Sequence, residues 1–124
     1  MLRTFVALTL IIPSLALSDT FVCVPEKGSG VTTGGNKPIA SALYDASTVK
    51  WIMTNERGDW RVKQLGEDVD TFDKCTSQFF CERSTGYAGV FMRDPDDGTF
   101  QVTWITVDGE RKTLLVAAGK CSKL

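Results

Sequence analysis

The residues best suited to chemistry in this chain are its four cysteines. The sequence contains no histidine. Cysteines can act as thiolate nucleophiles, bind zinc or pair as disulfides. A structural zinc site normally uses closely spaced pairs such as C-x2-C, and the sequence contains no such pair. An even number of cysteines in a small exported domain is typical of a disulfide framework. The four are Cys23, Cys75, Cys81 and Cys121.

The positions of these cysteines predict two disulfides among the three pairings that four cysteines allow. The stretch CTSQFFC keeps Cys75 and Cys81 close across a short bend, whereas Cys23 and Cys121 lie near the two ends of the exported chain. We therefore expect Cys75–Cys81 and Cys23–Cys121, and the loop-entropy model assigns the second bridge up to about 4–5 kcal/mol. Because every thiol is then used, we expect no catalytic thiolate, no metal site and no cofactor.

The amino-terminal segment has the three parts of a secretory signal peptide. Arg3 makes the start positive, residues 5–17 form an apolar run, and small residues precede a cut before Asp19. The run is shorter than the roughly 20 residues that a membrane-spanning helix needs, which argues against an uncleaved anchor. The sequence therefore predicts removal of residues 1–18 and a single mature domain of residues 19–124, in the periplasm or secreted.

Removal of this segment leaves 106 of the 124 residues and lowers the net charge from −1 to −2, because Arg3 is the only charged residue removed. A near-neutral chain lacks the basic face that nucleic acid binding normally requires. No later apolar stretch is long enough to span a membrane. We expect a monomer that binds no nucleic acid and has no membrane span after cleavage of the signal.

The last three residues read SKL, which is also the address of peroxisomal proteins. An exported chain leaves the cytosol before a peroxisomal receptor could read this address. We therefore interpret the tail as the segment that carries the last disulfide cysteine.

The remaining polar motifs are typical of turns. Residues 94–98 (DPDDG) and 66–70 (GEDVD) gather carboxylates without the alternating oxygens and distant Glu of a calcium loop. Residues 28–35 (GSGVTTGG) do not fit a phosphate-binding loop, and residues 57–59 (RGD) lie where a hairpin must turn. Because the commonest general base, histidine, is missing, we do not expect an enzyme.

Strand patterns and turn residues dominate the chain after the signal. Residues 20–24 predict a first short strand, and residues 25–38 predict a loop rich in Gly and Pro that could hold a little strand around Val31. Residues 39–47 predict either a helical turn or an irregular crossing. Six further segments alternate apolar and polar residues and are separated by turns. They cover residues 47–54, 60–65, 79–83, 86–94, 99–107 and 111–121.

These segments predict an all-β fold, a small antiparallel meander closed or nearly closed into a disulfide-stapled barrel of about seven to eight strands. A Cys23–Cys121 bridge would join its first and last strands, and closure would remove exposed sheet edges. In the last segment, Leu114, Val116 and Ala118 share one face.

Three tryptophans, Trp51, Trp60 and Trp104, share strand faces with aliphatic neighbours. Large aromatic residues in this position usually fill a core. They could also line an apolar cavity inside the barrel or form an aromatic patch at its mouth.

The order FVC, tryptophan-bearing hairpin, cysteine pair and GKC resembles small uncharacterised exported β-domain proteins of proteobacteria and their phages. The overall plan is also similar to the periplasmic inhibitors of C-type lysozyme, which implies a small barrel with bridged ends. In that family a Ser-Gly-x-x-Tyr loop enters the lysozyme cleft. Here residues 84–87 read STGY, which keeps the order but not the spacing, so the inhibitory residues are not transferred.

These features lead us to expect an exported β-barrel binding module, inhibitor-like in its use of loops. Its protein-binding residues would be Ser84, Gly86 and Tyr87, together with the hairpin tip at residues 55–59. The alternative is a carrier of a small apolar ligand, with the three tryptophans lining its cavity.

Overall fold

The computed structural model describes residues 19–42, 45 and 48–124, so the predicted signal segment, residues 1–18, lies outside the described residues. No helix in the described part has the length and apolar character needed to cross a membrane. Its strands are β1 (Thr20–Gly34), β2 (Ala40–Ala42), β3 (Trp51–Thr54), β4 (Arg61–Gln64), β5 (Lys74–Ser77), β6 (Phe80–Glu82), β7 (Gly89–Arg93), β8 (Thr99–Asp108) and β9 (Arg111–Lys123).

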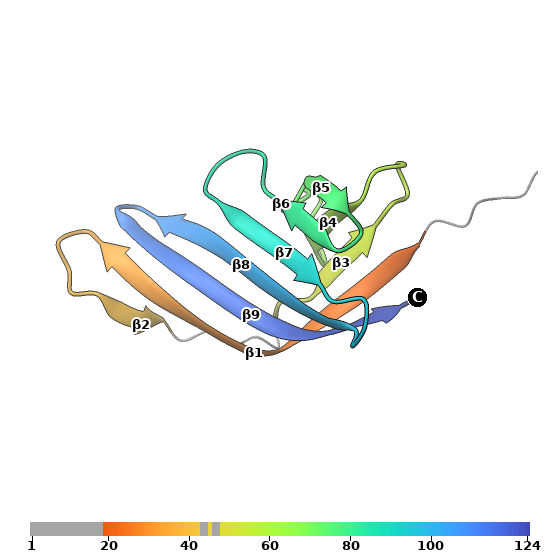
Figure 1. Cartoon of the computed structure of the whole chain (residues 1–124). Coiled ribbons are helices and arrows are strands. Elements are labelled where there is room, and N and C mark those ends of the chain that lie inside the picture. Colours follow the sequence, from red (N-terminus) through yellow and green to blue (C-terminus); the bar gives the residue numbers. More distant parts are fainter. Residues whose placement is uncertain (1–18, 43–44, 46–47) are drawn as a thin grey trace, which may run out of the picture.

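The strands form one antiparallel sheet in the order β4-β3-β1-β9-β8-β7-β6-β5, with β2 paired to β1 (Figure 1). The two ends of this order meet where Val62 of β4 and Phe72, just before β5, exchange two backbone hydrogen bonds of 2.9 Å. The sheet is therefore a nearly closed barrel along an eight-strand path, as predicted.

The first strand is much longer than the sequence pattern predicts. Residues 25–34, expected as loop, continue β1 and pair with β9 as far as Gly34 opposite Arg111, after a bulge between Pro25 and Lys27. The loop prediction was wrong because glycine, unfavourable in an isolated strand, is required here by close packing. A Cβ atom on Gly30 would lie 2.8 Å from the Leu115 side chain.

Two short strands were also not predicted. β2 occupies part of residues 39–47, where a helical turn or irregular crossing was expected, and it pairs with β1 at Ala42 opposite Gly30. Residues 43–44 and 46–47 of that segment lie outside the described residues. β5 lies inside the small disulfide loop, where Cys75 pairs with Cys81 of β6.

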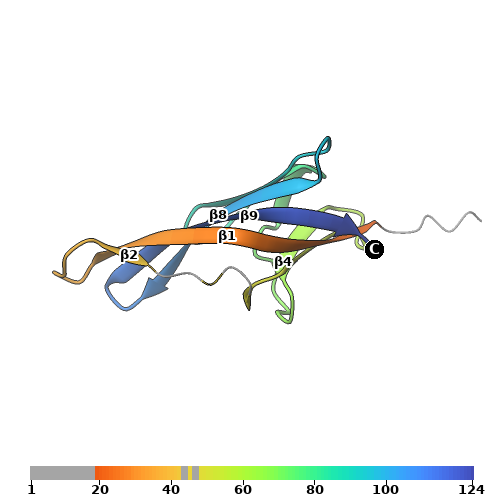
Figure 2. The same cartoon turned by 90° about the horizontal axis from the view of Figure 1, so that it is seen from below.

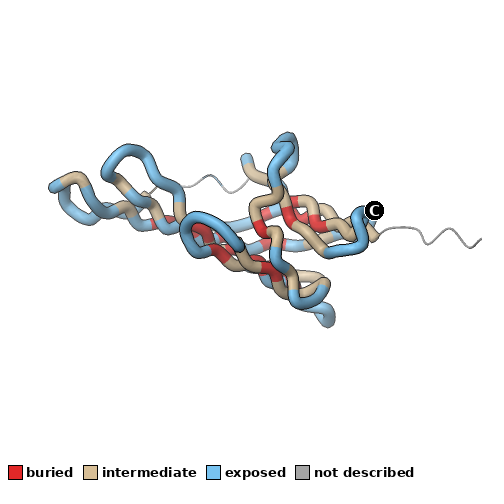
Figure 3. The backbone as a smooth tube through the Cα atoms, turned by 90° about the horizontal axis from the view of Figure 1, so that it is seen from above, coloured by how far each residue is buried: buried red, intermediate tan, exposed pale blue. Residues whose placement is uncertain are grey.

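The core is formed by inward-facing residues of both the short and the long strands, and Figure 3 shows the buried segments in red. Its largest side chains are aromatic, and Phe91 stacks on Phe100 with ring centroids 5.4 Å apart. The buried apolar residues are Cys23, Trp51, Met53, Val62, Phe72, Cys81, Phe91, Phe100, Val102, Trp104, Leu115 and Ala117.

The alternation in β9 is confirmed, and the structure shows which face points inward. Leu115 and Ala117 are buried, whereas Leu114 and Val116 remain 48% and 41% exposed. The apolar face that includes Leu114, Val116 and Ala118 is therefore the outer face of the sheet.

Both predicted disulfides are present, each between directly opposed residues of neighbouring strands. Cys23 of β1 faces Cys121 of β9, and Cys75 of β5 faces Cys81 of β6. Seen from below, β1 and β9 run side by side toward the end where the first bridge lies (Figure 2). The bridge thus joins the first and last strands at a point where the sheet already places them next to each other.

Candidate functional site

A cleft beside the barrel collects residues from three separate parts of the chain. Its volume is about 440 Å³, and its lining side chains come from residues 64–71, which include the last residue of β4 and the segment after it, from residues 83–87 between β6 and β7, and from residues 104–107 of β8. The β6–β7 loop projects at the top of Figure 1, away from β1. Three of the predicted binding residues line this cleft: Gly86, Tyr87 and Trp104.

The β6–β7 loop is held at its base by Ser84. The Ser84 hydroxyl donates a hydrogen bond to one carboxylate oxygen of Asp73, and the Ser84 backbone N–H donates to the other over 2.9 Å. These two bonds hold the pKa of Asp73 below its ordinary value. Gly86 then turns the chain with a φ of +76°, which only glycine adopts without strain. Ser84 therefore anchors the loop, and it is not among the lining residues.

Tyr87 is the exposed aromatic residue of this loop, with 44% of its surface accessible. The Nζ atom of Lys112 lies 5.3 Å from the centre of the Tyr87 ring, within the range of a cation–π contact. Lys112 pairs with Val107 across the β8–β9 ladder. The tyrosine ring is thus placed close to the end of β8.

The three tryptophans do not act as one group. Trp51 is wholly buried, and its ring meets Trp104 edge-on with centroids 5.3 Å apart. Trp104 is 5% exposed and contributes the inner end of the cleft. Trp60 lies apart from this pair, and its ring packs 6.1 Å from Phe21 at the start of β1.

Sequence reasoning missed the wall formed by residues 67–71. Val69 is 74% exposed there, although it is apolar. Asp70 accepts a hydrogen bond from Arg61 in an ion pair of 3.0 Å, and the Thr71 backbone N–H donates to the Val62 carbonyl over 2.8 Å. The single apolar residue within the acidic stretch GEDVD was the signal that could have identified this wall.

The hairpin tip at residues 55–59 does not belong to the cleft. Thr54 at the end of β3 pairs with Thr20 at the start of β1, and Asn55 accepts a hydrogen bond of 2.8 Å from the Asp19 backbone N–H. The cleft instead includes Trp104 of β8, which pairs with Leu115 of β9. Leu115 in turn pairs with Gly30, in the second half of β1. The two predicted binding loops are therefore separate, and Asp70 lies between them, because it lines both the cleft and a small hollow that includes residues from the 56–59 segment.

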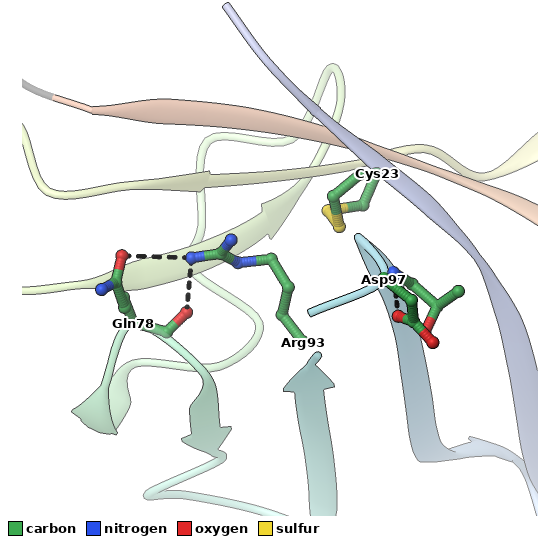
Figure 4. The surroundings of a disulfide bond; sticks show 6 residues. Cys23, Gln78, Arg93 and Asp97 are labelled. Carbon is green, nitrogen blue, oxygen red and sulfur yellow. Dashed lines mark hydrogen bonds between the residues drawn. A yellow bond between two sulfur atoms is a disulfide. The ribbon is translucent and has the colours of Figure 1, made fainter. Parts of the chain in front are cut away.

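Arg93 is a second feature that the sequence did not reveal. It lies on the inner side of β7 near the Cys23 bridge and donates hydrogen bonds to the backbone and side-chain oxygens of Gln78, at 3.1 and 3.2 Å (Figure 4). Its guanidinium carbon lies 3.8 Å from the centre of the Phe21 ring. Burial lowers the pKa of Arg93, and the carboxylate of Asp19 partly offsets this. Arg93 stabilises the bridged end of the barrel, opposite the cleft.

The cleft can therefore offer aromatic and apolar contact from Tyr87, Val69 and Trp104, with charged residues such as Glu67 and Arg83 beside them. Within the described residues, no group of three or more His, Cys, Asp and Glu side chains is placed to hold a metal ion. Comparison of the chain with protein-family models, curated proteins and solved structures found no match.

Proposed function

We propose that the mature chain is an exported binding module that recognises a protein partner through the Tyr87 cleft. The observation that carries this proposal is an exposed aromatic ring on an anchored loop beside an open cleft. Tyrosine gives a large contact area at a low cost in side-chain entropy, and buried tyrosines are frequent hot spots of protein interfaces. The Ser84–Asp73 bonds and the Gly86 turn hold the loop before any partner arrives, which reduces the entropy lost on binding.

Two disulfides support an oxidising compartment outside the cytoplasm. We assign the chain more narrowly to the periplasm or to secretion because of the signal-like segment at residues 1–18. The small-ligand carrier receives less support, because the Trp51 ring packs directly on Phe72, 5.5 Å between centroids, and on Trp104. These rings fill the space in which an internal ligand would lie.

The first partner to test is a C-type lysozyme, since the plan of the chain is similar to the inhibitors of that enzyme. Binding of the oxidised mature protein to lysozyme is measured by biolayer interferometry, and inhibition by a cell-wall lysis assay. If Tyr87 is a hot spot of the interface, the substitution Tyr87→Ala should weaken lysozyme binding at least about tenfold. Met92→Ala is the matched control, since Met92 is also a large exposed apolar residue but lies outside the cleft.

If the protein does not bind lysozyme, or if Tyr87→Ala and Met92→Ala weaken lysozyme binding equally, the proposal of an inhibitor that acts through Tyr87 is overturned. Native mass spectrometry of the same sample tests the carrier. A small apolar molecule that stays bound to the purified protein would favour the carrier over the protein-binding module.

A further inference from the structure

The floor of the cleft includes a strand edge to which no other strand is paired. β7 pairs with β8 only as far as Gly89 opposite Trp104, whereas β9 pairs with β8 to its end at Asp108. Residues 105–108 of β8 therefore have β9 on one side and no strand on the other. Ile105, Thr106 and Val107 all line the cleft.

Two hydrogen bonds show which backbone groups point to this open side. The Asp94 N–H donates to the Thr99 carbonyl on the β7 side, and the Cys121 N–H donates to the Gly98 carbonyl on the β9 side, both over 2.8 Å. In an antiparallel ladder, successive residues direct their backbone groups alternately to the two neighbours. Odd-numbered residues of β8 thus point toward β7, and even-numbered residues toward β9.

This alternation places the N–H and C=O of Val107 on the open side, whereas those of Ile105 face Ala88, which precedes Gly89 and lies opposite Ile105 in the β7–β8 register. Among the described residues, no backbone hydrogen bond from the β6–β7 loop reaches Val107. An unpaired edge of this kind is a template for another strand. Because Ala88 already lies opposite Ile105 in the β7–β8 register, an added segment would pair beyond Ala88, at Val107, without disturbing an existing pair.

We propose that an extended peptide segment of the partner protein pairs with the β8 edge at Val107. This inference rests on the proposed function and adds the mode of recognition, strand addition to an exposed sheet edge. Main-chain hydrogen bonds to the N–H and C=O of Val107 supply affinity in this mode. Alternate side chains of the peptide contact the surrounding walls, where Val69, Trp104 and Tyr87 offer apolar contacts.

The shape of the cleft favours one peptide segment over a second copy of this chain. The β8 edge is faced by residues 67–71 and by the loop that carries Tyr87, all of which line the same cavity. A second barrel that offered one of its own strands would bring the neighbouring strands of its sheet with it. A single extended segment needs only the space between these walls.

The test uses the oxidised mature protein and linear random peptides displayed on phage. The strongest selected peptide is synthesised, and its binding is followed by NMR shifts and by hydrogen exchange of the backbone amides. We expect the Val107 amide to exchange fast in the free protein and to become protected when the peptide binds. The Thr106 amide, which points toward β9, should be protected in both states.

Val107→Pro removes the N–H that faces the open side and no bond of the β8–β9 ladder. It should weaken peptide binding roughly fivefold to tenfold, the loss expected for one hydrogen bond. Val107→Ala keeps the N–H and is the matched control, with a change below about twofold. If the proline variant does not fold, amide protection in the unchanged protein decides the question.

The inference is overturned if no peptide is selected or if both Val107 variants weaken peptide binding equally. It is also overturned if the bound peptide shifts only resonances that lie outside residues 104–107 and the facing walls. A dimer of the free protein that Val107→Pro dissociates would also overturn it, because the edge would then serve a second copy. The lysozyme assay gives an independent result. If a peptide binds at the β8 edge but the protein does not bind lysozyme, the lysozyme-inhibitor function is rejected. If lysozyme binds and Val107→Pro does not change this binding, strand addition is rejected.

Discussion

Trp51 and Trp104 come from opposite halves of the barrel and meet edge-to-face, with ring centroids 5.3 Å apart and ring planes at 79°. Their strands are not neighbours, since β1 and β9 lie between β3 and β8 in the sheet. The contact therefore crosses the interior of the barrel. It links the buried core to the cleft, because Trp104 belongs to both.

Trp51→Ala should be among the most destabilising substitutions in the chain. The Trp51 side chain is wholly buried against several rings, and removal of such a ring leaves a cavity. We expect a loss of about 3–5 kcal/mol in the free energy of unfolding, measured by urea titration. Trp60→Ala is the control, and because Trp60 is only partly buried its loss should be clearly smaller.

Gly119→Ala should destabilise the pairing of β1 and β9. A Cβ atom at this position would lie 2.0 Å from the Val24 carbonyl oxygen, so the two backbones must move apart. We expect a loss of about 1–3 kcal/mol, which is typical of overpacking. The adjacent Ala118 faces outward, and Ala118→Ser should change the unfolding free energy by less than about 0.5 kcal/mol. Similar losses in the two variants would contradict this packing.

The two disulfides should differ in their contribution to stability. They close loops with sequence separations of 98 residues for Cys23–Cys121 and 6 residues for Cys75–Cys81. The loop-entropy model predicts losses of about 5 and about 2 kcal/mol when each pair is replaced by alanine. Unfolding of the two double variants in urea measures the difference. A larger loss from the short loop would show that native packing around Cys81, not chain entropy, dominates.

The β6–β7 loop should loosen in acid. Because the pKa of Asp73 is lower in the folded protein than in the unfolded chain, its bonds to Ser84 contribute stability above the ordinary carboxyl pKa of about 3.9. That contribution is lost as the pH falls through the lowered pKa. The Ser84 amide resonance should titrate with this carboxyl, and Asp73→Asn should remove the pH response. A Ser84 amide that does not move between neutral pH and about pH 2 would contradict the anchor.

Export should produce a chain that begins at Asp19 with both bridges formed. Mass spectrometry of the protein recovered from a bacterial periplasm should show the mature mass, with two hydrogen atoms fewer for each disulfide than in the reduced sample. The bridges require an oxidising compartment. A retained precursor with free thiols would contradict both the signal segment and the assigned compartment.

Local patterns in the sequence were sufficient to predict the fold class and the two disulfides. Apolar alternation and turn residues indicate strands at short range, and spacing alone pairs Cys75 with Cys81. The same patterns placed a turn at residues 84–86, but they began the next strand at Gly86, whereas β7 begins at Gly89. They were wrong about residues 25–34, because local propensity counts glycine against a strand, whereas close contact with β9 requires it.

The sequence by itself determined that this is a small all-β domain with two bridges and an aromatic core. Only the tertiary structure decided that Tyr87, Val69 and Trp104 share one cleft, that residues 55–59 lie outside this cleft, and that the edge of β8 is open. The physical reason is that local preference acts between neighbours in the chain. Cleft and edge depend instead on register, and register is set by pairing between distant segments.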